Sequence, residues 1–137
     1  MRVFLDANVL FSAAKSDGAV RELLLLVEQC GHQCCVDAYV IEEARRNLAA
    51  KAPDRISVLE TLLLRMKSAG AQPADPVLEA SLPLPAKDRP VLAAAIHLSC
   101  DALITGDRTH FGSLYGRTIH GVAIHSPRSL AEVLRVP

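Results

Sequence analysis

Short apolar runs alternate with stretches of helical periodicity along this chain, and this alternation constrains its fold more than any other feature. Residues 3–5, 33–36 and 102–105 are predicted to be buried strands, and residues 119–124 a weaker fourth strand. Strands that alternate with helices are typical of a parallel sheet. We therefore expect an α/β fold, a three-layer α/β/α sandwich with a mainly parallel central sheet, built from residues 1–137 as a single domain.

Helical segments are predicted between these strands. Apolar spacing predicts helices over residues 8–15, from Val20 to a stop at Gly31, from the N-cap Asp37 to Lys51, from Pro53 to near Gly70, over 91–98 and from Ser126 onward. Between residues 71 and 86, prolines and acids interrupt the pattern. That segment is predicted to be a connection with one short strand at most.

Four carboxylates occupy characteristic places in this pattern. Asp6 ends the first apolar run, and Asp107 follows the third one after Thr105 and Gly106. Open α/β sheets bind their ligands at the carboxyl ends of the strands, where these two acids lie. Glu43 and Asp88 fall within or at the start of helical stretches. If the four carboxylates converge, a hard divalent cation would relieve their mutual repulsion. Because the set contains no Cys or His, it favours Mg²⁺ or Mn²⁺ over zinc.

Two of these acids also have a simpler interpretation, and for a third the choice lies between neighbouring glutamates. Asp6 and Asp88 could each cap the helix that follows and do nothing more. Glu42 and Glu43 lie about 100° apart around a helix, so only one of them can face the site, and the spacing favours Glu43. Two neighbours would support the acids: Asn8 could orient Asp6 or a water, and Thr105 could bond to Asp107.

Composition limits the partners of the chain. Fifteen basic and fifteen acidic residues cancel, so any binding of phosphates must depend on a local patch. The candidates for such a patch, whose alternative is ordinary solvated surface, are Lys15, Arg45, Arg46, Arg89 and Arg108. The apolar run 23–27 is too short for a bilayer, and the N-terminus lacks a signal-peptide layout. We therefore expect a cytoplasmic location without membrane contact.

Cysteine and histidine cluster near residue 30, which suggests a zinc site at first sight. The cluster contains Cys30, His32, Cys34 and Cys35. It has no CxxC pair, and neighbours in a strand point to opposite faces of the sheet. We therefore interpret these cysteines and Cys100 as small buried apolar residues.

The segment 2–10, RVFLDANVL, resembles the opening of PIN-domain ribonucleases. Glu43 with its neighbours, Asp88 with residues 90–95, and the segment 103–111 match the family's remaining acidic positions in order. The resemblance implies a three-layer sandwich in which Asp6, Glu43, Asp88 and Asp107 hold Mg²⁺ or Mn²⁺. It also implies endonucleolytic cleavage of single-stranded RNA. Many small members are VapC-type toxins of toxin–antitoxin pairs and are often dimeric, so RNA, an antitoxin and a second copy of the chain are the expected partners.

The chain departs from the family pattern at one place. The family often has another acid two or three residues after the strand-end acid, whereas Arg108, Thr109 and His110 follow Asp107 here. A second metal therefore lacks its usual ligand. Thr109 could hold a water and His110 could touch a phosphate, although a structural or surface histidine is the simpler interpretation.

In the expected mechanism a bound cation activates a water for attack on the phosphorus, and Asp107 or Asp88 accepts its proton. Two other classes of function stay open: a catalytically degenerate PIN module that acts as a binding or scaffold protein, and a metal-dependent phosphatase for small molecules. The apolar residues of 23–27 and 56–66 exceed what one small sheet needs to cover. If they are exposed, a homodimer or an antitoxin segment would bury them, and the alternative is core packing.

Overall fold

A computed structural model describes residues 1–135, so residues 136–137 of the predicted domain lie outside the described part. Its centre is a six-stranded sheet with the strand order β3-β2-β1-β4-β6-β5. All neighbouring strands are parallel except β5 and β6. The strands are β1 (Arg2–Leu5), β2 (Gln33–Asp37), β3 (Lys67–Ala69), β4 (Ala102–Ile104), β5 (Thr118–Ile119) and β6 (Val122–His125). The predicted mainly parallel sheet is confirmed.

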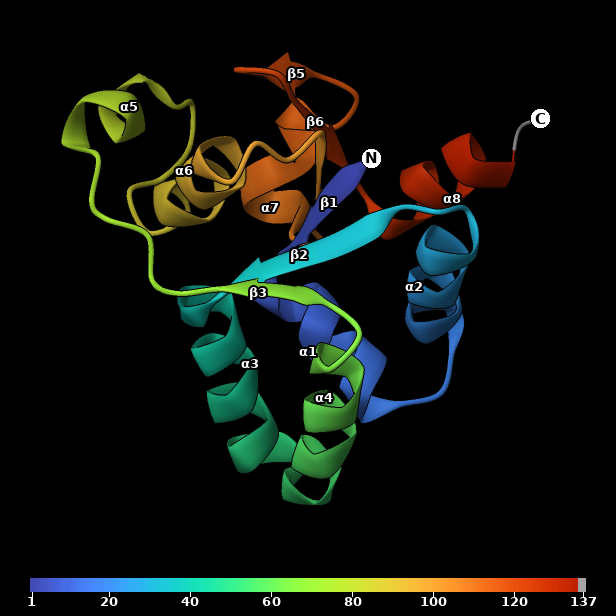
Figure 1. The fold of residues 1–137 in the computed structure, drawn as a ribbon. Helices are drawn as coiled ribbons and strands as arrows, with labels where there is room; N and C mark the ends of the chain where they lie inside the picture. Colours follow the sequence, from blue (N-terminus) through green and yellow to red (C-terminus); the bar gives the residue numbers. More distant parts are fainter. Residues whose placement is uncertain (136–137) are drawn as a thin grey trace.

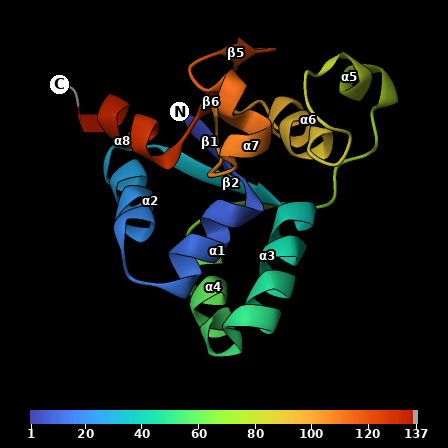
Figure 2. The same cartoon turned by 180° about the vertical axis from the view of Figure 1, so that it is seen from behind.

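Helices lie on both sides of this sheet (Figures 1 and 2). One side carries α1 (Ala7–Lys15), α2 (Ala19–Gln29), α3 (Ala38–Lys51) and α4 (Ile56–Leu63), and the other carries α5 (Pro76–Ser81), α6 (Arg89–His97) and α7 (Arg108–Phe111). The last helix, α8 (Pro127–Arg135), packs beside α2. The three-layer α/β/α arrangement predicted from the sequence is therefore confirmed. Within the described residues, no helix has the length and apolar character needed to cross a membrane.

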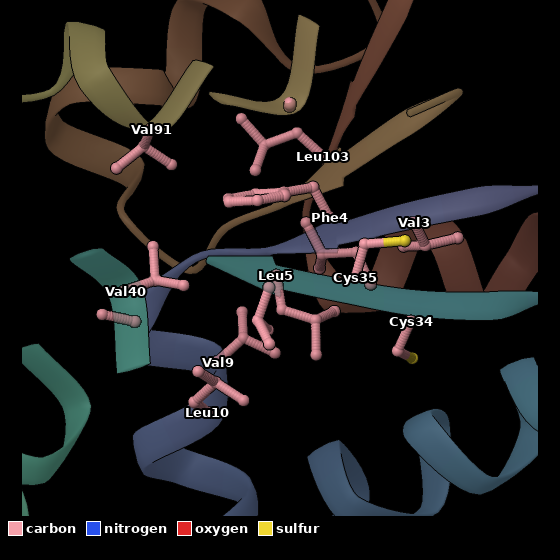
Figure 3. Packing of buried hydrophobic residues seen from close by; sticks show 14 of the residues in the cluster. Val3, Phe4, Leu5, Val9, Leu10, Cys34, Cys35, Val40, Val91 and Leu103 are labelled. Carbon is pink, nitrogen blue, oxygen red and sulfur yellow. The ribbon is translucent and has the colours of Figure 1, made fainter. Parts of the chain in front are cut away.

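The core is centred on β1, which lies between β2 and β4. Val3, Phe4 and Leu5 are fully buried, and Phe4 and Leu103 of β4 lie together in the interior (Figure 3). A strand covered by helices on both faces must be apolar at every position, which is why these runs are continuous and not alternating. Cys34, Cys35 and Cys100 are buried as predicted, whereas the prediction is wrong for Cys30, which is exposed.

Three predicted elements differ from the structure. The helix opened by Pro53 ends at Leu63, because the backbone tightens into turns over residues 64–66, and Lys67–Ala69 then pairs with β2 as an edge strand. The predicted connection 71–86 contains α5, which begins at Pro76 with Asp75 as its N-cap. The predicted strand 119–124 is divided into β5 and β6, because His120 and Gly121 adopt positive φ angles of 48° and 83° and form a hairpin turn.

The apolar surplus predicted on two helices is largely used in the core. Leu59 is fully buried on α4, and Leu23, Leu24 and Val27 are buried on α2. Three other apolar residues of the segment 56–66 are partly buried against the same core: Ile56, Leu63 and Met66. Core packing, the alternative, therefore accounts for most of these side chains. Among residues 1–135, the large apolar side chains that remain most exposed are those of Leu64 and Val77.

Candidate metal centre

The sheet brings two of the predicted acids to the same edge. Leu5, at the end of β1, is in register with Ile104, at the end of β4, so the residues that follow these two strands emerge side by side. They open onto a cleft of about 220 Å³, and all four predicted carboxylates line it. The lining consists of Asp6, Ala7, Asn8, Tyr39, Glu43, Asn47, Lys87, Asp88, Val91 and Asp107.

Asp6 both caps a helix and faces the cleft. Its Oδ1 accepts a hydrogen bond of 2.7 Å from the backbone N–H of Ala7, which begins α1. Its Oδ2 accepts bonds of 2.8 Å from Thr105 Oγ1 and 3.2 Å from Asn8 Nδ2. Capping and a place in the cleft are therefore not alternatives for this residue, because each carboxylate oxygen has a different set of partners.

Asn8 and Thr105 connect the ends of β1 and β4. Asn8 Oδ1 accepts a 2.8 Å hydrogen bond from the backbone N–H of Gly106, and Thr105 Oγ1 accepts one of 3.1 Å from the N–H of Asp107. A Cβ atom at Gly106 would lie 3.4 Å from Asn8 Oδ1, which is an ordinary van der Waals contact, so the network does not require a glycine at this position. The network fixes the positions of the two strand-end acids relative to each other.

Burial raises the pKa of Asp6 from 3.8 to about 6. Hydrogen bonds from Thr105 and Ala7 act in the opposite direction, and the negative charges of Glu43 and Asp88 raise the pKa further. The carboxylates are thus close enough to repel one another. A bound cation would relieve this repulsion.

Asp88 precedes α6, but its side chain makes no capping hydrogen bond. The alternative that it only caps this helix is therefore wrong. Its Oδ2 is buried and has no hydrogen-bond partner among the described residues. A buried carboxylate oxygen without a donor is costly unless a positive charge compensates it. This orphaned oxygen, among other oxygen donors, fits a divalent cation.

Asp107 and His110 form the other part of the centre. Asp107 caps α7, where its Oδ1 accepts a 3.1 Å hydrogen bond from the N–H of His110. His110 Nδ1 lies 2.9 Å from Asp107 Oδ2 and 3.1 Å from Asp88 Oδ2. Ligand atoms of Asp88, Asp107 and His110 all lie within 4.8 Å of one another, and these residues are the one such group of His, Cys, Asp or Glu in the described part of the chain.

Helix α3 provides the remaining acid. Glu43 is half-buried and lines the cleft, whereas Glu42 is exposed and does not. This is the orientation that helical geometry predicted. Tyr39 and Asn47, which lie four residues before and after Glu43, face the same cleft. Sequence reasoning missed both of them, although their spacing of four was a sufficient signal.

The basic residues predicted from sequence proximity do not line this cleft. Lys15 lies over the Phe11 ring at 5.6 Å, and Arg45 forms two bonds of 2.7 and 2.9 Å with Glu60. Arg89 Nε donates to the carbonyl of Leu84. Arg46 is exposed, and so is Arg108, which lines a neighbouring hollow with Gly106 and Tyr115. The cation that lines the cleft itself is Lys87, directly before Asp88, which the sequence analysis overlooked.

Comparisons with known proteins bear on the family and the fold of this chain. A family model described as a PIN domain matches residues 2–109. The fold is similar to that of a chain in the crystal structure of VapBC2 from Rickettsia felis bound to a DNA fragment from their promoter, with a TM-score of 0.67. The sequence identity is 15%, and the match covers 92% of this chain and 98% of that chain. A comparison with curated proteins gave no match.

Proposed function

Because this chain belongs to the PIN domain family, we propose that it is a metal-dependent endoribonuclease that cleaves phosphodiester bonds in single-stranded RNA. One observation carries the proposal: four carboxylates line one cleft at the carboxyl edge of the sheet, and a buried oxygen of Asp88 has no hydrogen-bond partner within residues 1–135. An acidic cleft of this kind repels phosphate unless a cation is bound, so the site needs a metal to act on RNA.

The metal would be Mg²⁺ or Mn²⁺, because both ions prefer oxygen ligands such as carboxylates. Its ligands would be Asp6, Glu43, Asp88 and Asp107. Such a cation supplies a water of lowered pKa and offsets negative charge on the phosphoryl group. Asn8 and Thr105 orient Asp6 through its Oδ2, so little rearrangement is needed when substrate binds. A carboxylate oxygen of Asp88 or Asp107 would take the proton of the attacking water.

Two residues of the cleft are suited to bind RNA. The ammonium group of Lys87 offers a positive charge to a phosphate next to the acids. Tyr39 is 43% exposed at the same cleft, so its ring can stack on an unpaired base. A local patch of this kind would compensate for the zero net charge of the chain.

The test uses a fluorogenic single-stranded RNA and p-nitrophenyl phosphate, each with EDTA, Mg²⁺ or Mn²⁺. We expect metal-dependent cleavage of the RNA and no hydrolysis of p-nitrophenyl phosphate. Asp6→Asn and Asp107→Asn should abolish the cleavage of RNA. Asp101→Asn is the matched control, because Asp101 is exposed at the opposite end of β4. Hydrolysis of the nitrophenyl ester without RNA cleavage would indicate a phosphatase, and RNA binding without any hydrolysis would indicate a scaffold protein.

We further propose that the protein is a cytoplasmic VapC-type toxin that is neutralised by an antitoxin and forms a homodimer. The likeness to VapBC2 and the family membership support the antitoxin partner. The exposed side chains of Leu64 and Val77 are apolar surface that a partner protein could cover. Co-purification with the product of the upstream gene, together with light scattering at micromolar concentration, tests both partners. If the protein is a monomer and does not bind the protein encoded by the upstream gene, it is a solitary nuclease and not a toxin of this type.

A further inference from the structure

The ring of His110 lies between two of the cleft carboxylates, those of Asp88 and Asp107. We propose that His110 binds the metal through Nδ1 together with Asp88 and Asp107, and that this nitrogen ligand makes the site prefer Mn²⁺ over Mg²⁺. The inference rests on the proposed function of the same cleft and specifies its metal.

The spacing of the donor atoms is that of a metal site. His110 Nδ1 lies 2.9 Å from Asp107 Oδ2 and 3.1 Å from Asp88 Oδ2. Neighbouring ligands of an octahedral ion with bonds of about 2.1 Å are about 3.0 Å apart. His110 Nδ1 therefore already stands at the separation from each carboxylate oxygen that adjacent ligands of one small cation require, and the ligand atoms of all three residues lie within 4.8 Å of one another.

Hydrogen bonds from the His110 ring cannot satisfy both of the carboxylate oxygens next to it. Nδ1 of a histidine carries at most one proton, and its contact with Asp107 Oδ2 has the geometry of a hydrogen bond. Asp88 Oδ2 is buried and still lacks a partner in the described part of the structure, despite its distance of 3.1 Å from the ring. A single cation would satisfy all three atoms, with the imidazole in its Nε2–H tautomer.

The fold holds the ring in this place. The N–H of His110 donates to Asp107 Oδ1, which fixes the residue one turn along α7 from the acid. The next residue, Phe111, is fully buried and anchors the helix to the core. The side chain of His110 is 27% exposed. The ring is thus positioned by its backbone and by the core, and not by its contacts with the two carboxylates alone.

A nitrogen ligand changes which ion the site selects. Mg²⁺ takes oxygen ligands and keeps several waters, whereas first-row transition ions also accept imidazole. Of the two ions that the carboxylates suit, Mn²⁺ is therefore the one that gains from His110. An aspartate at this position would supply oxygen instead and would reduce the advantage of Mn²⁺.

The test loads the metal-free protein with Mn²⁺ or Mg²⁺ and does not depend on activity. Pulsed electron paramagnetic resonance of the Mn²⁺ form should show nitrogen modulation from a coordinated imidazole, and His110→Ala should abolish it. His97→Ala is the matched control, because His97 pairs with Asp75 outside the cleft and should leave the signal intact. In calorimetric titrations, His110→Asp should lower the ratio of Mn²⁺ to Mg²⁺ affinity about tenfold.

The outcomes separate this inference from the proposed function. Mn²⁺ binding without nitrogen modulation in the wild type, or an unchanged affinity ratio in His110→Asp, would overturn the role of His110 while the nuclease proposal stands. Failure of the wild type to bind either ion would overturn both. The wild-type spectrum decides the matter even if a variant does not fold, and circular dichroism identifies that case.

Discussion

Replacing Asp6 by asparagine should stabilise the metal-free protein near neutral pH, although it removes a ligand from the proposed site. Burial raises the pKa of Asp6 from 3.8 to about 6. The fold therefore favours the protonated carboxyl group. That contribution to stability is fully present below pH 3.8 and is lost as the pH rises through about 6. Above this range the wild type carries a buried carboxylate at a cost that asparagine avoids.

The size of the effect follows from the shift in pKa. A shift of roughly two units corresponds to about 3 kcal/mol at 1.36 kcal/mol per unit. Asparagine can still accept the hydrogen bond from Ala7, but its amide group would face donors from Asn8 and Thr105. That mismatch costs about 1 kcal/mol or slightly more. We expect a net gain of about 1–2 kcal/mol above pH 7, or roughly 3–6 °C in melting temperature.

Thermal unfolding in EDTA between pH 4 and pH 7.5 measures this difference. Asp6→Asn should be more stable than the wild type at pH 7.5 and lose that advantage at pH 4. Asp54→Asn is the control, because the Asp54 side chain is 80% exposed and its replacement should change little at either pH. Added Mn²⁺ should stabilise the wild type in proportion to the logarithm of its concentration and leave Asp6→Asn unaffected.

Three results would contradict this reasoning. If Asp6→Asn is less stable than the wild type in EDTA at pH 7.5, burial of the carboxylate is not a net cost. If the difference between the two proteins does not change with pH, the ionisation of Asp6 is not its source. If Mn²⁺ stabilises both proteins equally, Asp6 is not a ligand.

Three other predictions concern the same cleft. Glu43→Gln should abolish RNA cleavage and Glu42→Gln should keep most of it, because Glu43 lines the cleft and Glu42 does not. The reverse ranking would indicate that Glu42 is the metal ligand. Lys87→Ala should weaken RNA binding and reduce its salt dependence by about one phosphate contact, whereas Lys67→Ala, on the edge strand β3, should change neither. Thr105→Val should lower the free energy of unfolding by about 1–3 kcal/mol, measured in urea, because its buried hydroxyl makes three hydrogen bonds; an unchanged midpoint would show that the network is dispensable.

The elements at the centre of the fold are readable from the sequence, and those at its edges are not. β1 and β4 are covered on both faces, so burial requires an uninterrupted apolar run that is visible in the chain. Lys67–Ala69 has no such run, because it is an exposed edge strand that exists only through its pairing with β2. The helix α5 was missed although Asp75 and Pro76 are a good N-terminal signal, since the prolines around it obscured the pattern.

The same distinction applies to the candidate site. The sequence indicates which residues are acids at strand ends and which glutamate faces inward, because both follow from local periodicity. It does not indicate which basic residue lines the cleft. Arg45 and Arg89 are near the acids in the chain, but Glu60 and the carbonyl of Leu84 hold them elsewhere. Lys87 lines the cleft without any distinctive pattern around it.

The sequence by itself determined the class of fold, the succession of its central strands and helices along the chain, and which four acids are candidates for the site, because hydrophobic periodicity and strand-end position are local properties. Only the tertiary structure decided which atoms meet. Thr105 reaches Asp6 across 99 residues of chain, and the ring of His110 comes to lie between Asp88 and Asp107. Such contacts depend on how strands pair and how helices pack across long separations. No local pattern encodes them, and they decide what the cleft can bind.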